Sequence, residues 1–313
     1  MAEREYLLAV DGDGKRTQAL VADTNGTVLA RGLGPGSNLH AVGIEGFGKS
    51  VQTAIEGALM NIVGPRAEVG VPGWKRVKLA AACFGLAGID GPDDEAQVSK
   101  WIADAGISKT FQVLNDSELI LAGGTPDGWG VALICGTGSV CLGRNPNGRA
   151  TRVGGWGPLL GDEGSGYALA VRALSLATQT ADGRADAKDL LRAILRHWSL
   201  ADAPALIRHV YAPAMTHSDI AALAEVVLGQ ASRGDAAAAS LVDEAADELL
   251  KALRAVMRVL DLKKPPVAFS GTFLRGTLRH TLQSRLGEDI GPVQYVADPA
   301  LGAVNIARRA LRA

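Results

Sequence analysis

The chain has few cysteines and no excess of charge of either sign. Its 32 Lys and Arg residues balance 33 Asp and Glu residues, so no basic excess points to nucleic acid or to an anionic membrane surface. Cysteine occurs three times, at Cys83, Cys135 and Cys141, and never as a CxxC pair. This usage fits a reducing compartment rather than a secreted disulfide framework.

Long apolar runs are also missing. No uninterrupted apolar stretch is long enough to span a bilayer. The charged residues 3–5 lead directly into an apolar strand, without the apolar core and cleavage site of a signal peptide. We therefore expect a cytoplasmic protein that binds neither nucleic acid nor a membrane. With 313 residues and 47% hydrophobic side chains, the chain can form two packed domains.

Glycine, in contrast, is plentiful at 39 residues and gathers in a few clusters between apolar segments. Short apolar runs bounded by turn residues predict three strands, the first ending at the glycine turn 11–14. Helices and two further strands follow, which predicts a mixed sheet with helices on its faces. The expected strands are 6–10, 17–22, 27–32, 77–84 and 110–114, and the expected helices are 44–60 and 93–105.

The pattern of strand, glycine turn and strand then restarts, which indicates an approximate structural duplication. Strands are expected at 130–135, 140–144 and 149–153, with a glycine turn at 136–139. A glycine-dense segment, 154–166, leads into a helix over 167–178. The remainder is expected to hold a mostly helical region over 188–260, a strand over 267–269 and a closing helix over 301–312.

The two glycine turns at matching positions are candidate phosphate-binding sites. A glycine turn between strands presents backbone N–H groups in a concave nest that can hold phosphate oxygens. Asp11 ends the first strand, where its carboxylate could organise Mg²⁺ through water, and Thr137 adds a hydroxyl to the second turn. The alternative is a pair of ordinary glycine-rich hairpins, which the matching positions disfavour.

Asp116 is the candidate general base. It follows an apolar strand, and a carboxylate at the carboxyl end of a sheet strand faces the region where α/β proteins bind ligands. A kinase needs a carboxylate there to accept the proton of the attacking hydroxyl. Because residues 117–122 look helical, Asp116 could instead serve as a helix N-cap, and position alone does not decide between the two.

The segment 154–166 is the most specific stretch of the chain. Its glycines allow a backbone to approach a ligand, and Asp162 and Glu163 provide acceptors for sugar hydroxyls. We expect Trp156, Leu159 and Leu160 to be buried, which argues against a plain flexible loop.

Together these motifs resemble the N-acetylglucosamine kinase group within the BadF/BadG/BcrA/BcrD ATPase-like family, part of the actin/hexokinase/Hsp70 superfamily. The resemblance rests on Asn115-Asp116, on the run 131–139 that ends Gly-Thr-Gly-Ser, and on residues 154–167. It covers nearly the whole chain. Shorter matches are Ser37-Asn38, residues 85–88, Ser270-Gly271 and residues 299–303.

The resemblance implies an α/β fold of two ribonuclease-H-like lobes, with ATP and the sugar in the cleft between them. The expected N-terminal lobe is 1–115, joined by the closing helix at 299–313, and the expected C-terminal lobe is 116–298. The implied activity is ATP- and Mg²⁺-dependent phosphorylation of an amino-sugar hydroxyl, most directly the 6-OH of N-acetylglucosamine or glucosamine. Dimers are common among similar proteins, so a homodimer is expected too.

The resemblance also assigns roles to residues. Asp116 matches the catalytic base and Asp11 the position associated with the metal. The matched sugar-binding positions are Asn38, Gly155, Trp156 and Asp162. The matched nucleotide-binding positions are Gly12, Gly14, Lys15, Thr17, Thr137, Gly138, Ser270 and Gly271.

The first turn departs from the family pattern, which usually reads Asp-Gly-Gly-Gly-Thr-Lys-Thr. Asp13 places a carboxylate where a glycine lets phosphate approach, and Lys15 replaces a threonine. Either Lys15 and Arg16 compensate, with Asp13 turned to Mg²⁺ or solvent, or nucleotide binding is impaired. The sequence 270–273 also differs from the usual Ser-Gly-Gly-Val of the family.

Two other functions fit parts of the pattern. A non-catalytic sugar-binding regulator would explain the altered first turn. An ATPase activator of a radical dehydratase would need cysteines that meet at a subunit interface to hold an iron–sulfur cluster. The three cysteines lie in or beside expected strands, so we interpret them as small core residues instead.

Overall fold

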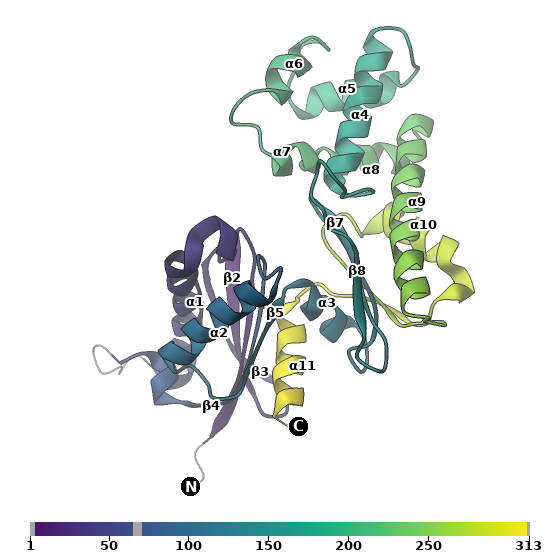
Figure 1. Ribbon diagram of the computed structural model, residues 1–313. Helices are drawn as coiled ribbons and strands as arrows, with labels where there is room; N and C mark the ends of the chain where they lie inside the picture. Colours follow the sequence, from purple (N-terminus) through teal and green to yellow (C-terminus); the bar gives the residue numbers. More distant parts are fainter. Residues whose placement is uncertain (1–3, 65–70, 312–313) are drawn as a thin grey trace. The chain divides into compact units, whose positions relative to one another are not determined.

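The computed structural model describes residues 4–64 and 71–311, which form two compact units (Figure 1). Unit 1 comprises Met1–Gly128 and Val296–Ala313, and unit 2 comprises Trp129–Tyr295. The domain limits expected above, at 115/116 and 298/299, stay a prediction. The structure packs the helix that follows Asp116 against the closing helix of unit 1. Within the described residues, no helix is long and apolar enough to cross a membrane.

Unit 1 is built on a mixed sheet with the strand order β3-β2-β1-β4-β5. The first three strands form the expected antiparallel meander, and β4 and β5 then add in parallel to β1. The strands are β1 (Glu5–Gly12), β2 (Arg16–Asp23), β3 (Val28–Pro35), β4 (Lys78–Leu86) and β5 (Phe111–Asn115).

Helices cover both faces of this sheet, because alternate residues of a strand point to opposite sides. Leu8 and Val10 of β1 share a core with α1 and α2, whereas Leu7 and Ala9 share one with α3 and α11. Figure 1 shows α1 and α2 on one side of the strands and α11 on the other. The helices are α1 (Leu39–Val63), η1 (Gly73–Arg76), α2 (Pro92–Ala105), α3 (Ser117–Gly124) and α11 (Ala300–Ala310).

Unit 2 repeats this topology, with the strand order β10-β9-β6-β7-β8. Again a three-strand antiparallel meander is extended by two parallel strands on the side of its first strand. The expected duplication and the ribonuclease-H-like arrangement are therefore confirmed. The strands are β6 (Gly130–Cys135), β7 (Ser139–Arg144), β8 (Ala150–Gly154), β9 (Val267–Ser270) and β10 (Val293–Tyr295), of which the sequence analysis missed only the short β10.

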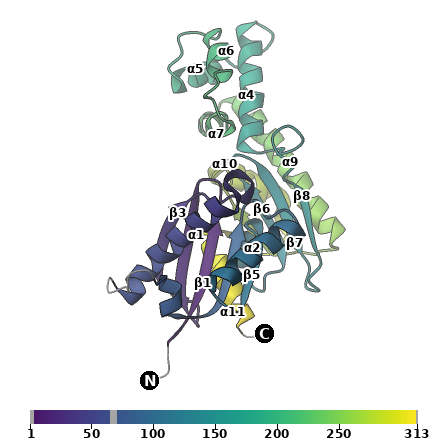
Figure 2. The same ribbon diagram turned by 60° about the vertical axis from the view of Figure 1, so that its left-hand side comes forward.

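The expected helical region of unit 2 is an insertion between β8 and β9. Figure 2 shows α5 and α6 beside the end of α4 that is farther from the strands. The helices of the insertion are α4 (Gly166–Ala181), α5 (Lys188–His197), α6 (Ala205–Val210), α7 (His217–Ala222), α8 (Ala224–Ser232) and α9 (Ala236–Val259), and α10 (Gly276–Leu286) and η2 (Gly287–Asp289) lie between β9 and β10.

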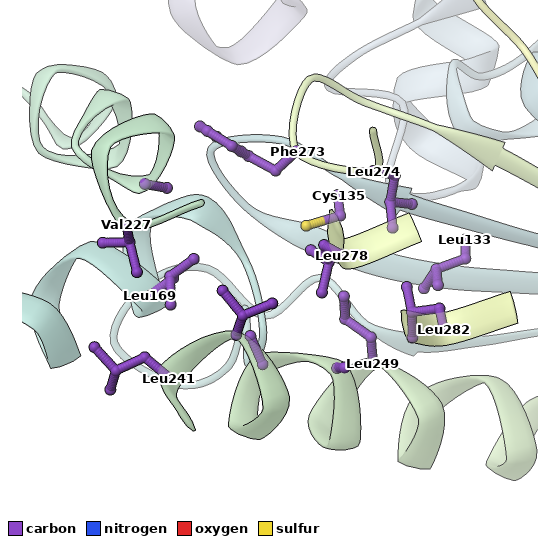
Figure 3. Close-up of a cluster of buried hydrophobic side chains, with 14 of the residues drawn as sticks. Leu133, Cys135, Leu169, Val227, Leu241, Leu249, Phe273, Leu274, Leu278 and Leu282 are labelled. Carbon is purple, nitrogen blue, oxygen red and sulfur yellow. The ribbon is translucent and has the colours of Figure 1, made fainter. Parts of the chain in front are cut away.

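The core of unit 2 joins its sheet to this insertion. Figure 3 shows the side chains of Leu133 and Cys135 from β6 beside Leu249 of α9 and Leu278 of α10. Cys135 and Cys141 are fully buried in unit 2, and Cys83 is fully buried in unit 1. Burial raises the pKa of the Cys83 and Cys135 thiols to about 12. The interpretation of all three cysteines as small core residues is confirmed.

Candidate functional site

The parallel strands of unit 1 bring the candidate acidic residues to one edge of the sheet. In the register of the sheet Gly12 lies beside Leu86 on β4, and Leu86 lies beside Asn115 on β5. Asp11 and Asp116, which the sequence separates by about a third of the chain, therefore lie at the same carboxyl edge. The negative charge of Asp116 raises the pKa of Asp11, so the two carboxyl groups lie within electrostatic range of each other.

Asp116 occupies the N-cap position of α3, but its side chain makes no capping hydrogen bond. The neighbouring Asn115 does this work: its Oδ1 accepts from the Ser117 backbone N–H at 3.1 Å and from the Ser117 hydroxyl at 2.6 Å. Burial raises the pKa of Asp116 to about 6, and the nearby Ser117 amide limits the rise. The Asp116 carboxyl group, which could have capped the helix, is thus available to accept a proton.

Asp11 carries the larger shift. Burial, followed by the negative charges of Asp116 and Asp13, raises its pKa to about 7. Asp298, which lies just before the closing helix, adds to this negative field. Its carboxylate is itself held by Gln18 Nε2 at 3.0 Å and by Arg31 Nη1 at 2.6 Å.

This group of neighbouring carboxyl groups suits a divalent cation with oxygen ligands. Among the described residues, no group of three His, Cys, Asp or Glu side chains is placed to hold a metal ion. An ion at Asp11 would therefore take most of its ligands from water and phosphate, as Mg²⁺ commonly does.

The side chain of Asp13 bonds to the backbone of its own turn, which the sequence analysis did not predict. The Asp13 Oδ1 accepts from the backbone N–H groups of Lys15 at 2.6 Å and Arg16 at 2.9 Å. Thr17, a candidate nucleotide ligand, is fully buried and donates its hydroxyl to Pro35 O at 2.6 Å. Gly14 lies in the exposed part of the turn.

Asn38 and Ser37 lie against this turn at the start of α1. Asn38 caps the helix, with its Oδ1 accepting from the His40 and Ala41 backbone N–H groups at 3.1 Å each. Ser37 is fully buried and its Oγ has no hydrogen-bond partner within the described residues. A Cβ atom at Gly12 would lie 2.2 Å from that Oγ, so only glycine fits there. A buried hydroxyl without a partner at this edge is consistent with a polar ligand.

The second turn is held by a side chain from a later segment of the chain. The Ser139 backbone N–H donates to Asp162 Oδ1 at 3.2 Å, and burial raises the pKa of Asp162. A Cβ atom at Gly138 would lie 2.7 Å from Asp162 Oδ2, so this glycine admits the carboxylate. At the start of α4, Tyr167 N donates to Thr137 O at 3.1 Å. The structure therefore brings Thr137, Gly138 and Asp162 together, which the sequence analysis did not predict.

The glycine-dense segment differs from expectation in its apolar residues. Trp156, Leu159 and Leu160 are 67%, 91% and 79% exposed, so the expectation that they are buried was wrong. Positive φ angles at Gly154, Gly155, Gly157 and Gly164 turn this segment away from the core of unit 2. Trp156 and Leu160 instead line a hollow of about 560 Å³ between the segment and α9, and Arg152 lies over the Trp156 ring at 5.9 Å.

Ser270 is the last residue of β9, and Gly271 follows it next to the second turn. Gly271 approaches it so closely that a Cβ atom would lie 2.2 Å from Cys135 O. Tyr295, which the sequence analysis did not single out, donates its hydroxyl to Gly271 O at 3.0 Å and accepts from Arg275 Nε at 2.8 Å. Since Tyr295 lies on the short strand β10, no sequence pattern connected it to Gly271.

Comparisons with known proteins identify the family of the chain. The BadF/BadG/BcrA/BcrD ATPase family model matches residues 8–307. The N-acetylmuramic acid/N-acetylglucosamine kinase of Clostridium acetobutylicum is 32% identical over 97% of this chain and 98% of its own length. The N-acetyl-D-glucosamine kinase of Dictyostelium discoideum is 29% identical, with the same coverage of both chains.

A solved structure from Chromobacterium violaceum, provisionally assigned as an N-acetylglucosamine kinase, is also similar. It is 26% identical, covers 97% of this chain and 99% of its own, and superposes with a TM-score of 0.71. A glucokinase of the ROK family from Streptomyces griseus is 16% identical with a TM-score of 0.53 and shares the fold. The chain therefore belongs to the BadF/BadG/BcrA/BcrD ATPase family.

Proposed function

We propose that this chain is an ATP-dependent sugar kinase that phosphorylates a hydroxyl of an amino sugar, with the 6-OH of N-acetylglucosamine or glucosamine as the first candidate. The observation that carries the proposal is Asp116. Its half-buried carboxyl group lies at the carboxyl edge of the sheet, makes no helix-capping hydrogen bond, and has a pKa of about 6. A general base works best with a pKa near the operating pH.

In the proposed mechanism Asp116 accepts the proton of the sugar hydroxyl as it attacks the terminal phosphate of ATP. The P–O bond to the new acceptor forms as the bond to the ADP leaving group breaks. Asn38, Gly155, Trp156 and Asp162 are proposed to bind the sugar. The proposed nucleotide contacts are Gly12, Gly14, Lys15, Thr17, Thr137, Gly138, Ser270 and Gly271, for which we expect mainly backbone N–H groups to act at the two turns.

Asp11 is the residue proposed to hold Mg²⁺. The raised pKa of about 7 reflects burial and neighbouring carboxylates, and a nearby cation would relieve both effects by favouring the ionised form. When bound, the ion would supply charge neutralisation to the phosphates. We also propose that the chain is a cytoplasmic homodimer, and this part of the proposal rests on the resemblance alone.

The sugar itself is the finer part of the proposal. The named relatives act on N-acetylglucosamine, and one of them also on N-acetylmuramic acid. A sugar panel should therefore include N-acetylmuramic acid, glucosamine and glucose beside N-acetylglucosamine.

A non-catalytic sugar-binding regulator is the second candidate, because the carboxylate of Asp13 takes up two backbone N–H groups of the first turn. The dehydratase activator is disfavoured, since Cys83, Cys135 and Cys141 are all fully buried in the cores of the two units.

A coupled ADP-release assay with Mg-ATP and the sugar panel tests the proposal. Sugar-dependent ADP release is the expected result, and the sugar with the highest kcat/KM identifies the substrate. Sugar binding by calorimetry without ADP release from any sugar would contradict the kinase and favour the regulator.

A further inference from the structure

The first turn of unit 1 is closed by a side chain of its own. Asp13 Oδ1 accepts hydrogen bonds from the backbone N–H groups of Lys15 at 2.6 Å and Arg16 at 2.9 Å. The Asp13 backbone N–H donates to Arg16 O at 2.9 Å, and Asp13 O accepts from Ser37 N at 2.9 Å. The carboxylate thus takes up two backbone N–H groups of the turn, and the backbone of Asp13 is anchored on both sides.

These N–H groups are the kind that hold phosphate oxygens in other glycine turns. Each N–H has one hydrogen to donate, so a carboxylate oxygen on both of them competes directly with an incoming phosphate oxygen. Charge acts in the same direction, because the Asp13 carboxylate would repel a polyphosphate at this edge. The Lys15 and Arg16 side chains are exposed and can attract the same anion.

We propose that Asp13 is a built-in anion that holds the first turn in its ligand-free shape and must leave the Lys15 and Arg16 N–H groups before a nucleotide phosphate can use them. Asp13 therefore weakens ATP binding and sets a high ATP KM. This inference rests on the proposed kinase function for the identity of the anion. It goes beyond that function by assigning a role in affinity to a residue that the family pattern lacks.

Two substitutions separate the effect of the Asp13 charge from the effect of its hydrogen-bond acceptor. Asp13→Asn retains an oxygen that can accept from both N–H groups but removes the charge. Asp13→Ala removes the acceptor as well. Alanine suits this position because φ of Asp13 is not positive, and it avoids the added freedom of glycine. We expect the Kd for ATP to fall about threefold in the Asn variant and about tenfold in the Ala variant, where tenfold corresponds to about 1.4 kcal/mol.

The chain offers a matched control in Asp23, at the opposite end of β2. Its Oδ1 accepts from the backbone N–H groups of Asn25 at 3.0 Å and Thr27 at 2.9 Å, so it closes a turn in the same way. The sheet register places Asp23 opposite Tyr6, whereas the first turn follows Gly12. Asp23→Ala should loosen its own turn and leave the Kd for ATP unchanged.

Two measurements on the full chain test the proposal. Hydrogen exchange of residues 12–17 without nucleotide reports occupancy of the N–H groups, and should be faster in Asp13→Ala than in wild type. Calorimetric titration with a non-hydrolysable ATP analogue reports competition. Unchanged exchange would overturn the occupancy, and faster exchange with unchanged or weaker analogue binding would overturn the competition.

The test also separates this inference from the kinase proposal. Sugar-dependent ADP release by wild type together with an unchanged Kd in Asp13→Ala would overturn the role of Asp13 alone. Absence of analogue binding in wild type and both variants would overturn both. Binding that appears only in Asp13→Ala would support the built-in anion while contradicting ATP-dependent turnover by the natural chain.

Discussion

The two units contain the same hairpin, but they close it in different ways. In unit 1 the turn between β1 and β2 is capped from within by Asp13. In unit 2 the turn between β6 and β7 is capped by Asp162, which comes from a segment 23 residues further along the chain. The start of α4 adds a hydrogen bond to Thr137 O, a support that the first turn receives instead from Ser37.

The two turns differ in their surroundings and in how they are supported. The turn of unit 1 lies among carboxyl groups with raised pKa values, Asp11 and Asp116, and its cap is local and partly exposed. The turn of unit 2 is supported by a buried carboxylate and by a helix, and Asp162 adopts a positive φ of 59° to reach it. Unit 1 thus holds the candidate proton chemistry, and unit 2 holds a turn that is fixed by tertiary contacts.

The largest expected effect is in unit 1. Asp116→Asn keeps the size of the side chain and removes the base, so kcat should fall by about 10²-fold or more. Sugar binding should change little, because the amide can still hydrogen-bond a hydroxyl. The ADP-release assay and calorimetry measure the two. Asp104→Asn, on the exposed face of α2, is the control. Turnover near the wild-type rate in Asp116→Asn would contradict the assignment of the base.

The ionised carboxylate of Asp11 should destabilise the folded state, whereas a carboxylate in an ordinary ion pair stabilises it. Its folded-state pKa of about 7 lies above the usual 3.8, so the native state retains a proton that the unfolded state has lost. Stability without divalent cations should therefore fall as pH rises from about 4 to about 7. Asp11→Asn should be more stable than wild type at pH 8, by on the order of 3 kcal/mol.

Urea unfolding with a chelator, at pH 5 and at pH 8, measures this difference. A matching experiment with Mg²⁺ should stabilise wild type more than Asp11→Asn. Equal pH dependence in the two proteins would contradict the raised pKa, and equal stabilisation by Mg²⁺ would contradict the metal assignment.

Substitutions at Asp162, which caps the turn of unit 2, should have a smaller effect on stability and test the difference between the two turns. Asp162→Ala leaves the buried Ser139 N–H without its acceptor, which should lower the free energy of unfolding by about 1–3 kcal/mol. Asp162→Asn keeps an acceptor oxygen, and asparagine tolerates a positive φ, so it should be nearly neutral. Asp13→Ala should cost less, because its turn is exposed. If Asp162→Ala were as stable as Asp162→Asn, the remote cap would contribute nothing.

The mildest expected effect is on the pH profile. Since Asp116 acts as a base only when ionised, kcat/KM for the sugar should be lost as pH falls through about 6, about tenfold per unit below that pH. Saturating Mg²⁺ keeps Asp11 ionised and removes its own titration from the profile. A rate that stays constant down to pH 5 would be incompatible with Asp116 as the base.

Most of the fold follows from the sequence, because each strand carries its own local signal. The apolar runs around residues 6–10 and 130–135 end at glycine turns, and both became the central strands of their sheets. The strand β10 was missed since its three residues, Val293–Tyr295, are too few for a periodic pattern. Trp156, Leu159 and Leu160 were expected to be buried because apolar side chains usually are, whereas the glycine angles around them turn the segment outward.

Sequence alone determined which residue types stand at the two turns and at the strand ends, since those depend on local patterns of apolar residues and glycines. Only the tertiary structure decided what each side chain does there. Asn115 takes the cap that Asp116 could have taken, Asp13 closes its own turn, and Asp162 closes the turn of another segment. The physical reason is that a carboxylate bonds whichever N–H groups the folded backbone places within about 3 Å, and that placement depends on the whole sheet.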